Sequence, residues 1–304
     1  MAKNCQKGTS PVAKNLRKGC VYMQIISSKE NEIVKHIKKL KEKKYRDLYN
    51  EFLVEGIKLV KEAVHENAKI KQIIVCEDCE KTENIPQDLK YEIAKKDCIY
   101  VTRNIFKSIS EVQEPQGIIA VVEKDDIKNA SIANNISDID FGQDVIVALD
   151  NIQDPGNLGT ILRTVDSCGL NQIIVSKGTA DCYNPKVIRS TMGAIFRVKI
   201  IEADDLKETL QELKKHEFKV VVSSLQAKKK IYDIDYNKKV IVIGNEANGV
   251  EKEIQDIADE KIKIYMLGKT ESLNASVATG VILYEYVRPV SYTHLRAHET
   301  RRHL

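Results

Sequence analysis

Two short apolar segments of the sequence each lead into a loop of small and polar residues. Residues 240–243 read Val-Ile-Val-Ile and run directly into Gly244, Asn245 and Glu246. Residues 262–266 are mostly apolar, and the loop that follows them, 267–274, carries amide, hydroxyl and carboxylate groups. Apolar β-branched runs suit buried strands of a parallel sheet, and open α/β sheets bind ligands at the carboxyl ends of their strands. The two loops therefore predict a ligand-binding site.

Common phosphate-binding and dinucleotide-binding patterns are absent from the sequence. Gly244 and Gly249 have the spacing of a P-loop, but Val250 and Glu251 occupy the positions that need Lys and Ser or Thr. No G-x-G-x-x-G occurs, and the helix-opening turn at residues 156–159 lacks a third glycine. These differences argue against an NTPase and against a nicotinamide-dependent oxidoreductase.

Three segments resemble, in the same order, the three signature motifs of the SpoU/TrmH family of RNA ribose 2′-O-methyltransferases in the SPOUT superfamily. They are residues 151–163 (NIQDPGNLGTILR), 243–250 (IGNEANGV) and 266–285. The resemblance covers residues 24–289 and implies an α/β fold. It predicts a parallel-sheet SPOUT domain with a C-terminal trefoil knot, preceded by a small α/β substrate-binding domain.

The resemblance implies S-adenosyl-L-methionine as the cofactor, bound against the backbone of the second and third motifs. Carried over position by position, the cofactor-binding residues are Gly244, Ile264 and Leu273, with Asn245 and Met266 as neighbours. Ile264 and Leu273 are equally suited to core packing, and both roles are compatible because backbone contacts leave the side chains free.

The same carry-over implies catalytic roles for Arg163, Asn157, Glu246, Ser272 and Asn274. In the family the matching arginine is placed at the ribose 2′-hydroxyl. A guanidinium group is a poor general base because it stays protonated in proteins, so we expect Arg163 to bind a phosphate and stabilise developing oxyanion charge. Asn157 could instead be only a helix N-cap, and Ser272 and Asn274 could cap the last helix. Glu246 is expected to orient Arg163 or a group of a partner chain.

Two classes of function stay open from the sequence. The first is a methyltransferase acting on ribosomal RNA of the 23S type, with transfer RNA as the other substrate. The second is a non-catalytic RNA-binding or ribosome-assembly protein with the same fold. The family resemblance also implies a homodimer whose active site lies near the interface.

The net charge of +4 is distributed unevenly along the chain. Residues 1–23 contribute +5 and residues 290–304 contribute +2, which leaves −3 for residues 24–289. An RNA partner must therefore be held by local basic patches and not by overall charge. The lysine run at residues 35–44 is one candidate, although such a run is also typical of a solvated helix face.

The cysteine pattern favours a reducing, cytoplasmic setting without a membrane anchor. The seven cysteines are an odd number without a disulfide framework, and the sequence has no long apolar run. Cys76 and Cys79 form a C-x-x-C without a second pair, so we interpret them as reduced thiols. His294 and His298 have the spacing of metal ligands, but no cysteine or carboxylate set accompanies them, and no metal site is expected.

Composition divides the chain into five segments. Residues 1–23 are interpreted as a disordered extension upstream of a start at Met23, with an RNA-binding arm or a targeting segment as alternatives. Residues 24–122 form the small α/β domain, which resembles the ribosomal-protein-like substrate-binding domain of many family members. Residues 123–144 are a polar linker, 145–289 are the methyltransferase domain, and 290–304 are an unrelated appended sequence.

Apolar periodicity and turn residues predict the elements that position the motifs. An S-x-x-E capping box at residues 27–30 is expected to begin the first helix. In the second domain, strands are expected at 145–149, 172–176, 196–201, 218–223, 239–243 and 262–266. Helices are expected at 157–168, 185–192, 206–216, 251–258 and 274–286. Gly169 suits the position after a helix C-cap, and Asn184-Pro185 suits an N-cap followed by Pro at the first helical position.

Overall fold

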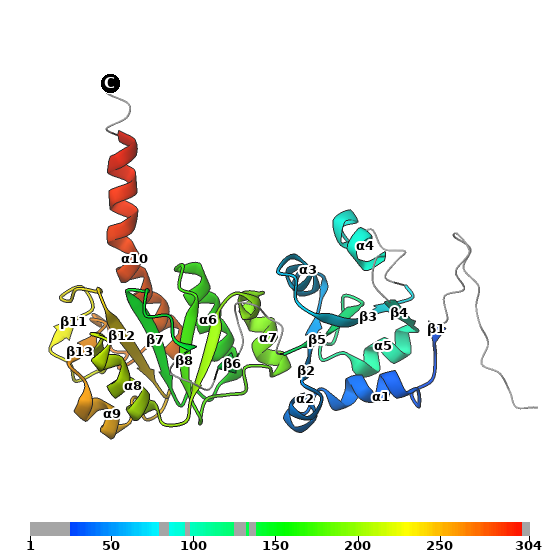
Figure 1. Ribbon diagram of the computed structural model, residues 1–304, viewed down its shortest axis with the longest axis horizontal. Coiled ribbons are helices and arrows are strands. Elements are labelled where there is room, and N and C mark those ends of the chain that lie inside the picture. Colours follow the sequence, from blue (N-terminus) through cyan, green and yellow to red (C-terminus); the bar gives the residue numbers. More distant parts are fainter. Residues whose placement is uncertain (1–24, 79–84, 95–97, 125–131, 134–137, 300–304) are drawn as a thin grey trace, which may run out of the picture. The chain divides into compact units, whose positions relative to one another are not determined.

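The computed structural model describes residues 25–78, 85–94, 98–124, 132–133 and 138–299, and of residues 289–299 it describes only the backbone (Figure 1). The expectations for residues 1–23, for Cys79 and for the side chains of the histidine pair near the C-terminus fall outside this description. Two compact units form. The first contains the described residues up to Val64 together with Ile70–Glu123, and the second contains His65–Lys69 and the described residues from Lys124 onward.

The first unit is built on a mixed five-stranded sheet. In spatial order the strands are β1 (Ile25–Ile26), β4 (Cys98–Val101), β3 (Ile70–Cys76), β5 (Ile118–Glu123) and β2 (Glu51–Glu55). β5 runs antiparallel to both β2 and β3, whereas β4 is parallel to β1 and β3. Its helices are α1 (Glu32–Lys39), α2 (Lys43–Tyr49), α3 (Ile57–His65), α4 (Gln87–Ala94) and α5 (Arg103–Ile109).

The first helix begins later than its sequence pattern predicted. The Asn31 side chain caps α1 by accepting a hydrogen bond from the N–H of Ile33, at 2.9 Å. Ser28 accepts only from the N–H of Glu30, so the prediction of an S-x-x-E capping box at residues 27–30 was wrong. The reason is that Asn is as good an N-cap as Ser, and capping from Asn31 buries Val34 and Ile37 on the inner side of the helix.

The second unit contains an eight-stranded sheet in which every strand pair is parallel. Its spatial order is β11 (Lys229–Lys230), β13 (Glu260–Lys263), β10 (Lys219–Ser223), β12 (Lys239–Gly244), β7 (Val145–Asp150), β8 (Gln172–Ser176), β9 (Lys199–Ala203) and β6 (Ile132–Ala133). The parallel α/β architecture expected from the sequence is confirmed. The carboxyl ends of β7, β10, β12 and β13 therefore lie at one edge of the sheet.

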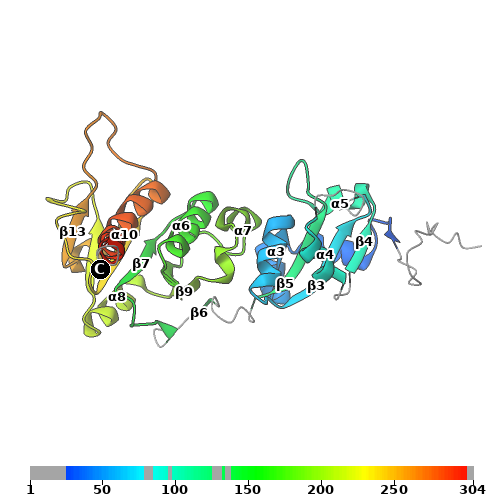
Figure 2. The same cartoon turned by 90° about the horizontal axis from the view of Figure 1, so that it is seen from above.

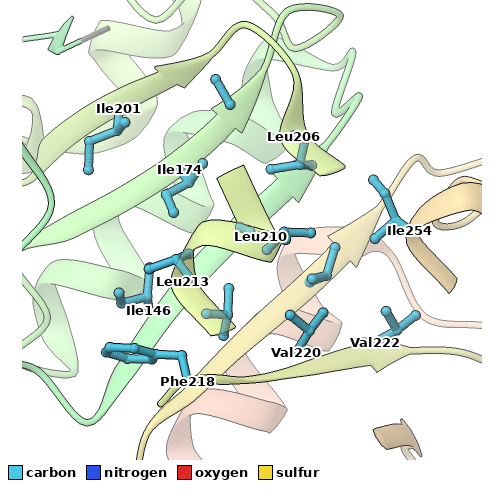
Figure 3. Close-up of a cluster of buried hydrophobic side chains, with 14 of the residues drawn as sticks. Ile146, Ile174, Ile201, Leu206, Leu210, Leu213, Phe218, Val220, Val222 and Ile254 are labelled. Atoms are coloured by element: carbon cyan, nitrogen blue, oxygen red, sulfur yellow. The ribbon is translucent and has the colours of Figure 1, made fainter. Parts of the chain in front are cut away.

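Helices cover both faces of this sheet (Figure 2). The helices α6 (Pro155–Ser167), α7 (Pro185–Thr191) and α10 (Ala275–Glu299) pack together on one face. The helices α8 (Leu206–Lys215) and α9 (Lys252–Ile257) pack on the other. Figure 3 shows the core under α8, where Leu206, Leu210 and Leu213 lie against side chains from the strands and Ile254 of α9. Because both sheet faces are buried at its centre, the central strands β7, β8, β10 and β12 contain nearly continuous apolar runs.

Local capping follows the sequence prediction in two places. Asn184 caps α7 by accepting from the N–H of Lys186, and Pro185 occupies the first turn. Gly169 has a φ of +75° directly after the C-cap of α6, a conformation that glycine adopts without strain.

Several boundaries in the second unit differ from expectation. Residues 194–196 form a 3-10 helix (η3, Ala194–Phe196), so β9 starts at Lys199 and not at residue 196. Part of the expected linker belongs to the second unit, because β6 pairs with β9 and Ile139 is buried. The last helix was expected to end at residue 286 but continues to Glu299.

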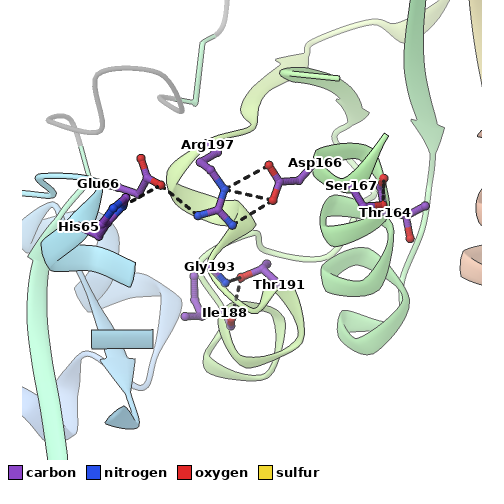
Figure 4. Close-up of polar contacts among 9 residues, drawn as sticks. All are labelled: His65, Glu66, Thr164, Asp166, Ser167, Ile188, Thr191, Gly193 and Arg197. Atoms are coloured by element: carbon purple, nitrogen blue, oxygen red, sulfur yellow. Dashed lines mark hydrogen bonds and ion pairs between the residues drawn. The ribbon is translucent and has the colours of Figure 1, made fainter. Parts of the chain in front are cut away.

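A charged network fixes η3 against α6 in the second unit (Figure 4). The Arg197 guanidinium donates from Nε and Nη2 to the Asp166 carboxylate, with an Nη2–Oδ2 distance of 2.9 Å. Its Nη1 donates to Glu66 Oε1 at 3.2 Å. A forked arginine–carboxylate pair restricts the orientation of both partners, so this network holds the end of α6 in place.

The N-cap of α6 provides a test of this local structure. Asp154 accepts from the N–H of Asn157 at 2.8 Å, and this bond, together with Lys186, lowers the pKa of the Asp154 carboxyl below its ordinary value. We expect Asp154→Ala to lower the free energy of unfolding by about 1 kcal/mol at neutral pH, measured by urea denaturation. The difference from wild type should shrink as the pH falls from the ordinary pKa of an aspartate towards the lowered pKa of the folded state, because the unfolded chain then binds a proton that the ionised cap does not. Asp154→Asn, which keeps the capping oxygen, is the control and should retain most of the stability. A difference that is constant down to acid pH would contradict the capping role.

Candidate functional site

Hydrogen bonds from the Asn245 side chain to backbone groups join the loops that follow β7 and β12. The Asn245 side chain donates from Nδ2 to the carbonyl oxygen of Asn151, at 2.8 Å. Its Oδ1 accepts from the N–H groups of Ala247 and Asn248, at 2.9 and 3.1 Å. Asn245 and Gly249 also exchange two backbone hydrogen bonds, which closes the loop. Asn245 therefore holds the loop conformation and links it to the neighbouring strand.

Gly244 lies where the chain returns on itself. A Cβ atom at this position would lie 2.2 Å from the Gly249 carbonyl carbon and the Val250 nitrogen, both of which are backbone atoms. Backbone atoms in this closed loop cannot move aside, so a larger residue would open the loop. The close approach explains why a glycine follows the β12 strand directly.

The second and third motifs are connected to the first through Asn157. The Asn157 Nδ2 donates to Glu246 Oε1 at 2.8 Å, and the Asn157 Oδ1 accepts from the Asn274 Nδ2 at 2.9 Å. Asn274 Oδ1 in turn accepts from the N–H and hydroxyl of Ser276 in the first turn of α10. One amide thus bridges the loop after β12 and the start of α10.

This arrangement decides between the alternatives that the sequence left open. Asn157 is not the N-cap of α6, because that position is held by Asp154. Asn274 does cap α10, and it contacts Asn157 at the same time. The Glu246 carboxylate accepts from Asn157, and the role expected for it, orienting Arg163 or a group of a partner chain, stays a prediction.

Arg163 extends from the solvent-exposed side of α6. Leu158, Ile161, Leu162 and Val165 face the core from the same helix, which places Arg163 on the outer side. Among the described residues, none forms a hydrogen bond or ion pair with its guanidinium. The structure therefore brings Asn157, Glu246 and Asn274 together but leaves Arg163 unengaged. Ser272 is exposed and is not joined to them.

The expected cofactor positions lie on two loops at the same sheet edge. β13 ends at Lys263, so Ile264 and Met266 belong to the following loop and not to a strand as expected. Their side chains are half-buried, whereas Leu273 is exposed. Exposed apolar groups next to close-packed backbone at the carboxyl ends of parallel strands fit a nucleoside-containing ligand such as S-adenosyl-L-methionine.

Sequence reasoning did not single out Asp150 and Asn151 as members of this site. Asp150 is only 2 % exposed at the end of β7, and its Oδ2 accepts from the N–H of Glu251 at 2.7 Å. Burial raises the pKa of the Asp150 carboxyl, and the Glu251 bond opposes this rise. Asn151 has a φ of +62° and donates its N–H to Ser176 Oγ. The sequence feature that could have identified them is their position as a polar pair directly after the apolar residues 145–149.

Neither a membrane-spanning helix nor a metal-ligating cluster occurs in the described part of the chain. None of its helices is both long and apolar enough to cross a bilayer. No group of three or more His, Cys, Asp or Glu side chains there has an arrangement that could hold a metal ion.

Comparison with known proteins agrees with this architecture. Residues 144–284 match the model of the SpoU rRNA Methylase family, and residues 31–120 match that of the MRM3-like substrate binding domain. A Bacillus subtilis protein, 23S rRNA (guanosine(2553)-2'-O)-methyltransferase RlmP, is 33 % identical over 263 residues, which cover 86 % of this chain and 98 % of the relative. The crystal structure of an AdoMet-bound rRNA methyltransferase from Sinorhizobium meliloti is 30 % identical, with a TM-score of 0.72 over 88 % of this chain and 98 % of that one.

A further solved structure supports the fold alone. The SpoU methyltransferase AviRb from Streptomyces viridochromogenes, with bound AdoMet, has a TM-score of 0.73 at 24 % identity and covers 86 % of this chain and 98 % of that one. The parallel sheet and the bridged strand-end loops define a methyltransferase of the SPOUT class with an N-terminal substrate-binding domain. The chain belongs to the SpoU rRNA methylase family.

The Asn157 bridge predicts a strong effect of a single-atom change. We expect Asn157→Asp to lower the methylation rate by about 10²-fold, because a carboxylate at this position would repel Glu246 and displace the loops by the order of an ångström. The measurement is single-turnover transfer of labelled methyl groups to RNA. The matched control is Gln153→Glu, which makes the same amide-to-acid change at an exposed neighbouring position. Equal rates in the two variants would argue that the bridge does not organise the site.

Proposed function

We propose that the protein transfers a methyl group from S-adenosyl-L-methionine to a ribose 2′-hydroxyl of structured RNA, with 23S-type ribosomal RNA as the substrate. The observation that carries this proposal is the Asn157-centred bridge, which assembles polar residues of all three motifs at one sheet edge. The full-length similarity to a protein named as a 23S rRNA (guanosine-2'-O)-methyltransferase supports the choice of RNA. Transfer RNA stays the second candidate, because a B. subtilis relative with 34 % identity is named as a tRNA/rRNA methyltransferase.

Gly244, Ile264 and Leu273, with Asn245 and Met266, would hold the cofactor, which supplies an already activated methyl group. A donor of this kind needs positioning more than covalent assistance. The rigid loop around Asn245 would provide that positioning, since its backbone is held by five hydrogen bonds.

On the substrate side, the unengaged Arg163 guanidinium would bind a phosphate next to the target ribose and stabilise negative charge on the reacting oxygen. Glu246 uses only Oε1 for Asn157, and within the described residues its Oε2 has no hydrogen-bond partner. This second oxygen would be available to the substrate. Ser272, exposed on the loop before α10, would contact the same nucleotide.

We further propose a homodimer formed through α10. Val277, Val281 and Tyr284 recur at four- and three-residue spacing on the exposed side of this helix, which gives an apolar stripe. An amphipathic helix whose apolar side faces water is stabilised when a second copy covers it. The trefoil knot stays a prediction, as do the domain limits 24–122 and 145–289 and the cytoplasmic location.

The reaction is tested with purified protein, methyl-labelled S-adenosyl-L-methionine and unmodified ribosomal or transfer RNA, followed by digestion to nucleosides. We expect label on a ribose, and we expect Arg163→Ala to lower the rate by about 10²–10³-fold because one oxyanion-stabilising donor is removed. Lys215→Ala removes a positive charge at an exposed position of α8, on the other face of the sheet, and is the control that should leave the rate unchanged.

Two results would contradict the proposed reaction. Label on a base would keep the class of enzyme but overturn the chemistry. Stoichiometric cofactor binding with no label on any RNA would favour the non-catalytic RNA-binding protein.

The homodimer is tested by Val281→Glu, which introduces a charge into the apolar stripe. We expect the variant to be monomeric in size-exclusion chromatography with light scattering, because burying an unpaired carboxylate at an interface is unfavourable. Leu48→Glu is the control, since it makes the same kind of change at an exposed apolar residue of the first unit. A wild-type protein that is already monomeric would contradict the proposed interface.

A further inference from the structure

Two exposed tyrosines and one lysine lie together at the β11 edge of the eight-stranded sheet. The Lys230 Nζ is 5.4 Å from the ring centroid of Tyr232 and 5.0 Å from that of Tyr265. Lys230 ends β11 and pairs in register with Lys263 of β13, and Tyr265 lies two residues beyond Lys263. The three side chains, here called the tyrosine platform, thus come from adjacent strand ends at the edge shown in Figure 1.

Both tyrosine side chains of the platform are exposed to solvent. Tyr232 is 51 % exposed and Tyr265 is 55 % exposed. In the loop after β13 exposure alternates, because Tyr265 and Leu267 are exposed while Ile264 and Met266 are half-buried. The platform is therefore formed by the outer side of the loop whose inner side carries the proposed cofactor positions.

The charge around the platform is suited to an anionic partner. Lys228, Lys230 and Lys263 have no carboxylate within ion-pair distance in the described part of the chain, whereas Lys229 is paired with Glu260 at 2.7 Å. Asp233 accepts from the backbone N–H of Lys230. Interaction with Tyr232 raises the pKa of the Lys230 ammonium, which keeps it protonated.

We propose that the tyrosine platform binds an unpaired RNA base next to the methylated nucleotide. This inference rests on the proposed function, since it assigns part of the RNA contact of that same site. Aromatic rings stack on bases of any sequence, and an ammonium group next to the rings neutralises the adjoining phosphate. RNA recognition also favours single-stranded nucleotides, whose bases are free to stack. None of the platform residues belongs to the apolar stripe of α10, which is the surface proposed to contact a second copy of the chain.

Alanine substitutions test whether the rings bind RNA. We expect Tyr232→Ala and Tyr265→Ala each to raise the Kd for a single-stranded oligoribonucleotide by about 5- to 150-fold. This is the range expected for the loss of one base–aromatic stack. Tyr232→Phe and Tyr265→Phe should bind as the wild type does, because stacking needs the ring and not the hydroxyl. The phenylalanine variants are therefore the matched controls for the alanine variants.

Three outcomes would contradict the proposal that the tyrosine platform binds RNA. The first is that the alanine variants bind RNA as tightly as the phenylalanine variants do. The second is that Tyr265→Ala loses affinity for S-adenosyl-L-methionine in calorimetry, which would assign the ring to the cofactor. The third is that it converts the protein to a monomer, which would assign the ring to a second copy.

A fluorescence experiment tests stacking without relying on catalysis. The chain contains no tryptophan, so Tyr265→Trp introduces a single reporter. We expect its fluorescence to be quenched by single-stranded RNA and much less by a duplex of the same sequence.

The two proposals fail in different ways. If the wild type methylates no RNA but the quenching occurs, the platform stands and the proposed reaction fails. If methylation occurs but Tyr265→Ala leaves both the Kd and the rate unchanged, the reaction stands and the platform fails.

Discussion

The side-chain amide of Asn157 donates to Glu246 and accepts from Asn274, and these two hydrogen bonds connect the first turn of α6, the loop after β12 and the start of α10. An amide offers both a donor and an acceptor in fixed geometry, so the Asn157 side chain serves both neighbours at once. The loop after β12 can then be oriented relative to α6 and α10. Every candidate role at this sheet edge depends on that relative position.

Beneath the bridge, the site is held by backbone contacts that leave little room for change. Gly244 packs against the Gly249–Val250 backbone, and Asn245 links its own loop to the carbonyl group of Asn151. The parallel strands β7 and β12 are paired in register up to their last residues, Asp150 and Gly244. A rigid sheet edge of this kind suits a reaction in which the protein supplies position more than covalent chemistry.

The exposed surface of the second unit separates into regions of different character. The apolar stripe on α10 is suited to a copy of the chain, and the tyrosine platform beside β11 is suited to nucleic acid. Arg163 lies on α6, which packs against α10. A dimer formed through α10 would therefore place catalytic candidates near an interface while the platform stays open to RNA. The body of the chain has no net positive charge, so such local features must provide the affinity for RNA.

The sequence by itself determined the class of fold and the elements whose signals are local. The strand Gln172–Ser176, the Asn184 cap and the Gly169 terminus were predicted because buried apolar runs, capping groups and positive-φ glycines act over a few residues. The motif residues could be named in advance because their segments resemble the three signature motifs of the family. Only the tertiary structure decided their partners: Asn157 lies 89 residues from Glu246 and 117 from Asn274 in sequence, so their contact depends on how the strands are ordered in the sheet. The same long-range packing incorporated β6 into the sheet and buried Asp150, two features for which the local composition offered no decisive signal.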